Sequence, residues 1–243
     1  MMAQSNHGRV VWITGASSGI GKALAEVFAQ AGDMVILSAR RESPLKSLAR
    51  RIRAHGGSCE VTVCDVRSEK SLRRAAKRIT SNVGWVDVLI NNAGVTSFKR
   101  FDEISTREFD EVIATNLRGA FLATKAVLDS MVKRRRGVIL NIISFAAKTT
   151  YEGSAAYSAS KAGVESMMNV LRAETRGRGL KVVNVYPGAI LTPMWKAEHR
   201  RKYSNVMMSP KEIARLIYEA SIHPSSGMVE ELVVRPQIGD LRV

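Results

Sequence analysis

Cysteine is scarce in this chain: its 243 residues include only Cys59 and Cys64. These two lie five apart on one expected strand, so their side chains point to opposite faces and cannot easily form a disulfide. A disulfide-stabilised secreted scaffold is therefore excluded, and a reducing cytoplasm fits best. The histidines show no metal-ligand spacing with the cysteines, so no metal site is expected; they are His7, His55, His199 and His223.

Long apolar runs are also missing. No stretch approaches the roughly 20 apolar residues that a membrane-spanning helix needs. Residues 1–15 contain no apolar run of the signal-peptide kind ahead of the first expected strand. We therefore expect a cytoplasmic protein that has no membrane partner.

Acidic residues are few, since 22 Asp and Glu face 37 Lys and Arg and leave a net charge of +15. Residues 40–53 and 67–78 each hold six basic residues against one glutamate, so together they carry +10, and 133–136 reads KRRR. A basic surface can attract nucleic acid or anionic lipid. No DNA- or RNA-binding motif accompanies the charge, so we expect solvated helix faces with a bias toward an anionic cofactor, and no nucleic-acid partner.

What the sequence does have is a regular alternation of apolar strand-like runs and helical segments. Helix starts are indicated at Ser43-Pro44, Ser68, Ser105 with Glu108, and Ser209-Pro210; the third begins a long helix that reaches about Arg134. This alternation predicts a single doubly wound α/β domain, with a seven-stranded parallel sheet covered on both faces. The expected strands are 9–14, 34–39, 59–64, 86–91, 137–144, 180–187 and 228–236.

A glycine-rich turn, TGASSGIG at residues 14–21, joins the first strand to the first helix. Gly15 permits the tight turn, Gly19 lets the backbone approach a pyrophosphate, and Gly21 lets the helix pack closely on the strand. The N-terminus of the helix offers free N–H groups and a positive dipole to phosphates. At the first strand-to-helix turn of this pattern, the motif predicts a dinucleotide site.

The end of the second expected strand distinguishes NADP from NAD. It reads LSARR, with Arg40 and Arg41 where an NAD-binding protein would carry a carboxylate. A guanidinium suits the 2′-phosphate of NADP, so NADP(H) is favoured, although Arg40 could be one more surface arginine. Asp65, after the third strand, is a candidate acceptor for the adenine amino group; the alternative is a polar strand end.

Several further motifs stand in a fixed order along the chain. They are TGxxxGxG from Thr14 to Gly21, NNAG from Asn91 to Gly94, Ser144 thirteen residues before Tyr157, YxxxK from Tyr157 to Lys161, and PGxxxT with Pro187, Gly188 and Thr192. With Asn116 in the long fourth helix, these motifs resemble the short-chain dehydrogenase/reductase family over nearly the whole chain. The resemblance implies a Rossmann-type fold, with residues 9–190 as cofactor-binding and catalytic core and 191–228 covering the substrate.

The resemblance also assigns roles. Ser144, Tyr157, Lys161 and Asn116 would be catalytic: Tyr157 as general acid in carbonyl reduction, Ser144 as donor to the substrate oxygen, Lys161 on the nicotinamide ribose, and Asn116 holding a water. A nearby ammonium is expected to lower the pKa of Tyr157. The expected cofactor contacts are Gly15, Ser17, Ser18, Gly19, Ile20, Gly21, Arg40, Asp65, Val66, Asn92, Ala93, Gly94, Tyr157, Lys161, Pro187, Gly188, Ile190 and Thr192.

Substrate selection should lie after the sixth strand. Residues 188–209 include Trp195, which with Ser144 and Tyr157 is an expected substrate contact; Met194, Tyr203, Met207 and Met208 could wall a pocket, although for the methionines core packing is favoured. The ending VEELVVRPQIGDLRV lacks the glycine-rich finish common in ketoacyl reductases. With PGAILTPMW, it resembles bacterial sepiapterin reductases and related broad carbonyl reductases.

The favoured function is an NADPH-dependent reductase of a small ketone or aldehyde. The alternatives are pterin side-chain reduction, an NADP-binding regulator without chemistry, and an NAD-linked alcohol oxidase if Arg40 meets no phosphate. Family resemblance also implies a homodimer or homotetramer built on helices around 106–134 and 157–176.

Overall fold

The computed structural model describes residues 8–222 and 227–241. His7, His223 and the part of the expected covering region at 223–226 lie outside the described residues. Among the helices that are described, none is long and apolar enough to cross a membrane.

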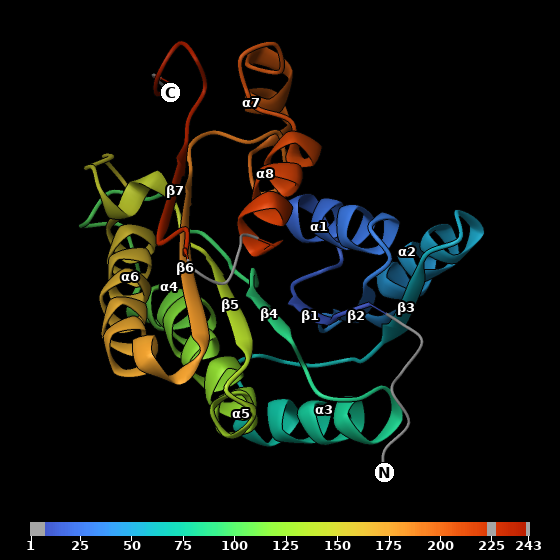
Figure 1. The fold of residues 1–243 in the computed structure, drawn as a ribbon. Coiled ribbons are helices and arrows are strands. Elements are labelled where there is room, and N and C mark those ends of the chain that lie inside the picture. Colours follow the sequence, from blue (N-terminus) through green and yellow to red (C-terminus); the bar gives the residue numbers. More distant parts are fainter. Residues whose placement is uncertain (1–7, 223–226, 242–243) are drawn as a thin grey trace.

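Seven parallel strands form one sheet in the order β3-β2-β1-β4-β5-β6-β7 (Figure 1). All seven expected strands are present, so the predicted fold class is confirmed. The order reverses between β1 and β4, and in open α/β sheets ligands bind at such a switch point, outside the carboxyl ends of the strands. The strands are β1 (Val10–Thr14), β2 (Met34–Ser38), β3 (Ser58–Val61), β4 (Val88–Asn91), β5 (Gly137–Ile142), β6 (Leu180–Pro187) and β7 (Glu231–Val234).

Helices cover both faces of this sheet. Figure 1 shows α1 and α8 side by side on one face, with α3, α5 and α6 on the other. A hydrophobic core lies on each face of the sheet, and successive residues of a strand point into opposite cores. Ile13 packs under α1 and α8, whereas Trp12 packs under α3 and α5. The helices are α1 (Gly19–Gln30), α2 (Glu42–Ala54), α3 (Glu69–Asn82), α4 (Thr106–Val112), α5 (Gly119–Arg134), α6 (Ala155–Thr175), α7 (Ala197–Lys202) and α8 (Pro210–Ile222).

The two cysteines lie on opposite sides of the sheet, as expected. Cys59 belongs to the core beneath α1 and α2, Cys64 belongs to the core beneath α3, and both thiols are free. Burial raises the pKa of each thiol, which keeps both protonated and unreactive at neutral pH.

One helix start differs from the prediction. Ser43 was expected to cap α2, but the helix begins at Glu42, with Arg41 as its N-cap residue and no side-chain cap. Pro44 then occupies the third helical position, which is tolerated because the N–H groups of the first turn lack intrahelical partners. The other indicated starts hold: the Ser68 hydroxyl accepts from Ser71 N, and Ser105 forms a complete capping box with Glu108.

The long fourth helix changes its winding in the middle. Between α4 and α5, residues Ile113–Arg118 form a π-helical segment, η1, which contains Asn116. A π segment widens the helix by one residue per turn and is often found at functional sites. Here it presents the Asn116 side chain to the loop that follows β4.

Candidate active site

A large cavity of about 1060 Å³ lies along the carboxyl ends of the strands. It extends from the glycine turn after β1 to the segment after β6. All but two of the expected site residues line it: Gly15, Ser17, Ser18, Gly19, Ile20, Arg40, Asp65, Val66, Asn92, Ala93, Gly94, Ser144, Tyr157, Lys161, Pro187, Gly188, Ile190, Thr192 and Trp195. Gly21 and Asn116 are the two expected site residues that do not line this cavity.

The glycine turn has the geometry of a phosphate cradle. Gly15 has φ +67°, and a Cβ there would stand 2.8 Å from Ala93 Cα; Gly19 has φ +54°. Both conformations favour glycine. At the start of α1, Ser18 makes no side-chain cap and the first turn carries no acidic residue. The helix N-terminus therefore presents unshared N–H groups and an unopposed positive dipole to the cavity.

Gly21 acts through packing rather than through contact with the cavity. A Cβ at this position would collide with Asn92 Nδ2 and the Gly15 carbonyl oxygen. That amide nitrogen donates to Thr14 O at 2.9 Å and to Gly15 O at 3.1 Å, so it ties the turn after β4 to the glycine turn.

The cationic end of the cavity is formed by Arg40, Arg41 and Arg67. Asp65 lies against Arg67, whose Nη2 donates to its Oδ2 at 2.8 Å and whose Nε donates to its Oδ1 at 3.1 Å. This hydrogen bonding, with a smaller contribution from the charge of Arg40, holds the pKa of Asp65 below its usual value. Asp65 is therefore an ionised acceptor, partly engaged by Arg67.

At the opposite end, Tyr157 on α6 meets Ser144, which follows β5. The two side chains are hydrogen-bonded, and the Ser144 Oγ also accepts from Ala146 N at 3.1 Å. Burial raises the pKa of Tyr157 and the Ser144 hydrogen bond lowers it, with a net upward shift. The expected net lowering is therefore wrong for this structure: burial outweighs the hydrogen bond from Ser144, and the phenol is protonated at neutral pH.

Lys161 lies one helical turn from Tyr157, with Nζ 5.6 Å from the centre of the phenol ring. Nζ donates to the Ile142 carbonyl oxygen at 2.8 Å. Burial lowers the pKa of Lys161 to about 8. The ammonium thus sits beside the phenol in an apolar setting and can release its proton near neutral pH.

Asn116 links the loop after β4 to the helix that carries Tyr157 and Lys161. Its Oδ1 accepts from Val95 N at 2.8 Å, and its Nδ2 donates to Val95 O at 2.9 Å and to Ser160 Oγ at 3.0 Å. A second, small cavity of about 10 Å³ lies between Asn116 and Lys161. This volume is about that of one water.

An aromatic wall borders the space in front of Tyr157. The Phe98 ring lies 6.1 Å from Tyr157 and 6.3 Å from Trp195, nearly parallel to the indole, and Trp195 in turn lies 6.4 Å from His199. Phe98, Trp195 and His199 all line the cavity.

Two of the methionines after β6 differ in their burial. Met207 is buried in the core, as expected. Met194 is exposed and lines the cavity, so core packing was the wrong prediction for that residue.

The C-terminal segment after β7 completes the same end. Asp240 and Leu241 line the cavity, and Arg235 pairs with Asp240 at 2.9 Å. Burial, together with a hydrogen bond to Asp240, raises the pKa of Tyr151 to about 12. The contacts of Asp240 with Arg235 and Tyr151 thus hold the C-terminal segment against the main cavity.

Sequence reasoning missed Phe98, His199, Tyr151 and Asp240. The aromatic residue Phe98, in the loop that directly follows the NNAG motif, was a usable signal. Asp240 gave none, because its distance in sequence from every motif hides its place in the fold.

Comparison with known proteins agrees with this geometry. A family model described as short chain dehydrogenase matches residues 9–202. The sepiapterin reductase of Chlorobaculum tepidum is 32% identical over 240 residues, which are 96% of this chain and 98% of that protein.

Solved structures are similar over almost the whole chain. A metagenomic short-chain oxidoreductase in complex with NADP has a TM-score of 0.84 at 32% identity, and covers 95% of this chain and 98% of its own. An actinorhodin polyketide ketoreductase with NADPH has a TM-score of 0.89 at 31% identity, and covers 99% of this chain and 100% of its own. The fold, the order of the motifs and these similarities lead to one conclusion: the chain belongs to the short-chain dehydrogenase family and is an oxidoreductase.

Proposed function

We propose that this protein is an NADPH-dependent carbonyl reductase that converts a compact ketone or aldehyde to the alcohol. The observation that carries the proposal is the convergence of Ser144, Tyr157 and Lys161 on one end of a cavity whose other end holds the glycine turn and Arg40. One continuous site thus joins a dinucleotide cradle to a proton donor.

The residues present fit NADPH. The cradle at Gly15 and Gly19 and the uncapped start of α1 suit a pyrophosphate. Arg40 and Arg41, with no carboxylate at the end of β2, suit the 2′-phosphate. Asp65 and the main chain of Val66 would face the adenine, and Pro187, Gly188, Ile190 and Thr192 the nicotinamide end. When bound, the cofactor supplies the hydride.

Tyr157 supplies the proton. The pKa of a phenol lies well above 7 and burial raises that of Tyr157 further, so the phenol carries its proton at neutral pH and acts as general acid toward the developing alkoxide. Ser144 donates a hydrogen bond to the same oxygen and stabilises its charge. Lys161, with a pKa lowered to about 8, stabilises the phenolate that remains and can return a proton to it. A water in the small cavity beside Asn116 would connect Lys161 onward.

The aromatic wall supports a flat or ring-bearing substrate. Phe98 and Trp195 present nearly parallel rings, interplanar angle 23°, beside the reacting hydroxyl. The similarity to a sepiapterin reductase makes a pterin side-chain ketone one candidate.

We also propose that the chain forms a single domain that acts in the cytoplasm. Residues 9–190 would form its cofactor-binding and catalytic core, and residues 191–228 would cover the substrate.

We further propose that the protein works as a homodimer or homotetramer through the helices around 106–134 and 157–176. Large apolar side chains stand exposed on these helices: Phe109, Phe121 and Val170. A contact between subunits through these helices would cover these side chains.

The test is NADPH oxidation, followed by the nicotinamide absorbance, against sepiapterin, diketones, aldehydes and 3-keto esters, with Tyr157→Phe as the control. We expect turnover that falls roughly a hundredfold or more in the variant. NADPH binding without turnover on any carbonyl would favour the regulator instead. Retention on heparin without cofactor binding would favour a nucleic-acid role.

A further inference from the structure

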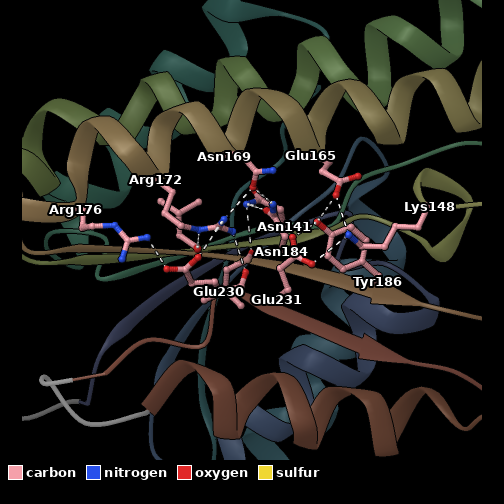
Figure 2. A network of polar contacts seen from close by, with 12 residues as sticks. Asn141, Lys148, Glu165, Asn169, Arg172, Arg176, Asn184, Tyr186, Glu230 and Glu231 are labelled. Carbon is pink, nitrogen blue, oxygen red and sulfur yellow. Dashed lines mark hydrogen bonds and ion pairs between the residues drawn. The ribbon is translucent and has the colours of Figure 1, made fainter.

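Lys148 lies at one end of a network of polar contacts that the reaction itself does not use (Figure 2). Its Nζ pairs with Glu165 Oε1 at 2.9 Å and with Glu231 Oε2 at 3.1 Å, and lies 4.1 Å from the centre of the Tyr186 ring. The Tyr186 hydroxyl reaches the same two carboxylates, at 2.9 Å and 3.2 Å. One cation is therefore held by two anions and an aromatic face, from three different elements.

Along the main chain, Lys148 is joined to Ser144 by one short turn. The residues between them form a 3₁₀ turn, η2 (Phe145–Ala147), with Ser144 at its start and Lys148 at its end. The turn is closed by Ala147 N donating to Ser144 O at 3.1 Å and Lys148 N donating to Phe145 O at 2.9 Å. Because these bonds close the turn, a constraint on the position of Lys148 also restricts the position of Ser144.

Through Glu165, Lys148 is joined to the helix that carries Tyr157. Tyr157, Lys161 and Glu165 follow each other at four-residue intervals on α6, and so share one face. The same face continues with Asn169, Arg172 and Arg176 (Figure 2). Arg172 Nε donates to the carbonyl oxygen of Val182 on β6 at 2.8 Å. The helix is thereby held against β6 along its length, and Glu165 is a fixed anchor.

The cluster differs from an ordinary surface ion pair. The Glu165 side chain is 19% exposed, and Tyr186 is fully buried. Burial lowers the pKa of Lys148, but the hydrogen bonds and charges of Glu165 and Glu231 outweigh it and raise the pKa overall. By contrast, Lys133 and Asp129 on α5 form an ion pair at 2.7 Å with both side chains more than 70% exposed. Isolated pairs of that kind contribute little, whereas a network with several partners can fix geometry.

We propose that Lys148 is a positioning residue, which sets the distance and direction of the Ser144 hydroxyl relative to Tyr157 by tying the turn after β5 to Glu165 on α6. The proposal rests on the proposed reductase function, because the positioned pair is the proton-donating pair. Lys148 touches neither substrate nor cofactor in this role. Removing it leaves Glu165 and Glu231 facing each other without a cation, and the turn loses its tether.

The test compares Lys148→Met with Lys148→Arg, with the double variant Lys148→Met/Glu165→Gln, and with Lys133→Met as the matched control. In Lys148→Met we expect kcat to fall roughly tenfold, since a donor displaced from its place loses most of its effect, while KM for NADPH stays within about twofold. Lys148→Arg restores kcat because it can bridge both carboxylates. The double variant recovers thermal stability, since the repulsion is relieved, but not kcat.

A second readout does not depend on turnover. The titration of Tyr157 is measured from tyrosinate absorbance, as the difference between each protein and its Tyr157→Phe counterpart. Loss of the Ser144 hydrogen bond should move the Tyr157 titration upward in Lys148→Met and leave it unchanged in Lys133→Met. If the wild type reduces no carbonyl, the proposed function fails, yet this shift still tests the positioning. A Lys148→Met protein with wild-type kcat and unshifted titration, or a double variant that recovers kcat, would overturn it.

Discussion

The ammonium of Lys161 donates to the carbonyl oxygen of Ile142 at 2.8 Å. Ile142 is the last residue of β5, two residues before Ser144, so this bond joins the helix that carries Tyr157 to the strand that delivers Ser144. The lysine therefore has a structural contact in addition to its place beside the phenol. Its burial makes this contact sensitive to pH.

Between about pH 8 and pH 10 the wild type should become more stable, relative to Lys161→Met, as the pH rises. The folded pKa of Lys161 is lowered to about 8 from 10.5, so over this range the unfolded chain binds a proton that the folded protein has released. The gain ends near pH 10.5, where the lysine of the unfolded chain also loses its proton; the raised pKa of Tyr157 affects both proteins alike. Urea unfolding across this range, on both proteins, measures the difference. Parallel curves for the two proteins would show that Lys161 titrates normally.

Arg40→Asp should raise KM for NADPH by roughly tenfold to a hundredfold, since a charge-assisted bond to the 2′-phosphate is replaced by repulsion. The KM for NADH should fall or stay level, because the carboxylate suits a free ribose hydroxyl. Arg50→Asp is the matched control: the same charge change on exposed α2, away from the cavity. Equal effects of the two changes would mean that Arg40 acts only through overall charge.

Gly21→Ala should destabilise the fold by about 1–3 kcal/mol and weaken cofactor binding. Its methyl group would collide with Asn92 Nδ2 and Gly15 O, and so push apart the two turns that line the cavity. Gly177→Ala places a methyl group with nothing within 4 Å, and should leave both stability and binding unchanged. Thermal unfolding with and without NADPH checks the pair; a variant as stable as the control would show that the turns can separate freely.

Trp195→Ala should raise KM for ring-bearing carbonyls about tenfold and leave KM for NADPH and for small aliphatic aldehydes unchanged. The reason is the loss of the indole that stacks on Phe98 in front of Tyr157. Trp85→Ala removes an exposed indole that does not line the main cavity and serves as control. A uniform rise for all substrates would instead indicate that Trp195 shapes the whole covering segment.

Local patterns were sufficient for the sheet, and they located many of the residues that line the main cavity. Tyr157 and Lys161 share a face because of helix geometry, and the glycines at 15, 19 and 21 mark a turn that few other residues can adopt, so both could be predicted. The direction of the Tyr157 pKa shift was not predictable, because it depends on how deeply the phenol is buried once α6 packs on β5. Asp240 and Tyr151 meet only after the chain end folds back, which no local signal encodes.

The start of α2 shows a smaller limit of the same kind. Serine followed by proline favours a helix start, but the chain can begin its first turn two residues earlier at no cost in hydrogen bonds, since those N–H groups have no intrahelical partner in either case. Sequence preference therefore locates the helix, and packing of Leu45 and Leu48 sets its phase.

The π segment at Ile113–Arg118 behaves like an insertion that the helix has absorbed. Removing one residue there would restore ordinary α winding, and α5 would keep its phase relative to α4, because the wide turn takes up the extra residue. The narrower turn would move Asn116 away from Val95 and Ser160, while the faces of α5 that pack on the sheet would stay in place. The extra residue therefore serves the contacts of Asn116 and not the packing of the helix.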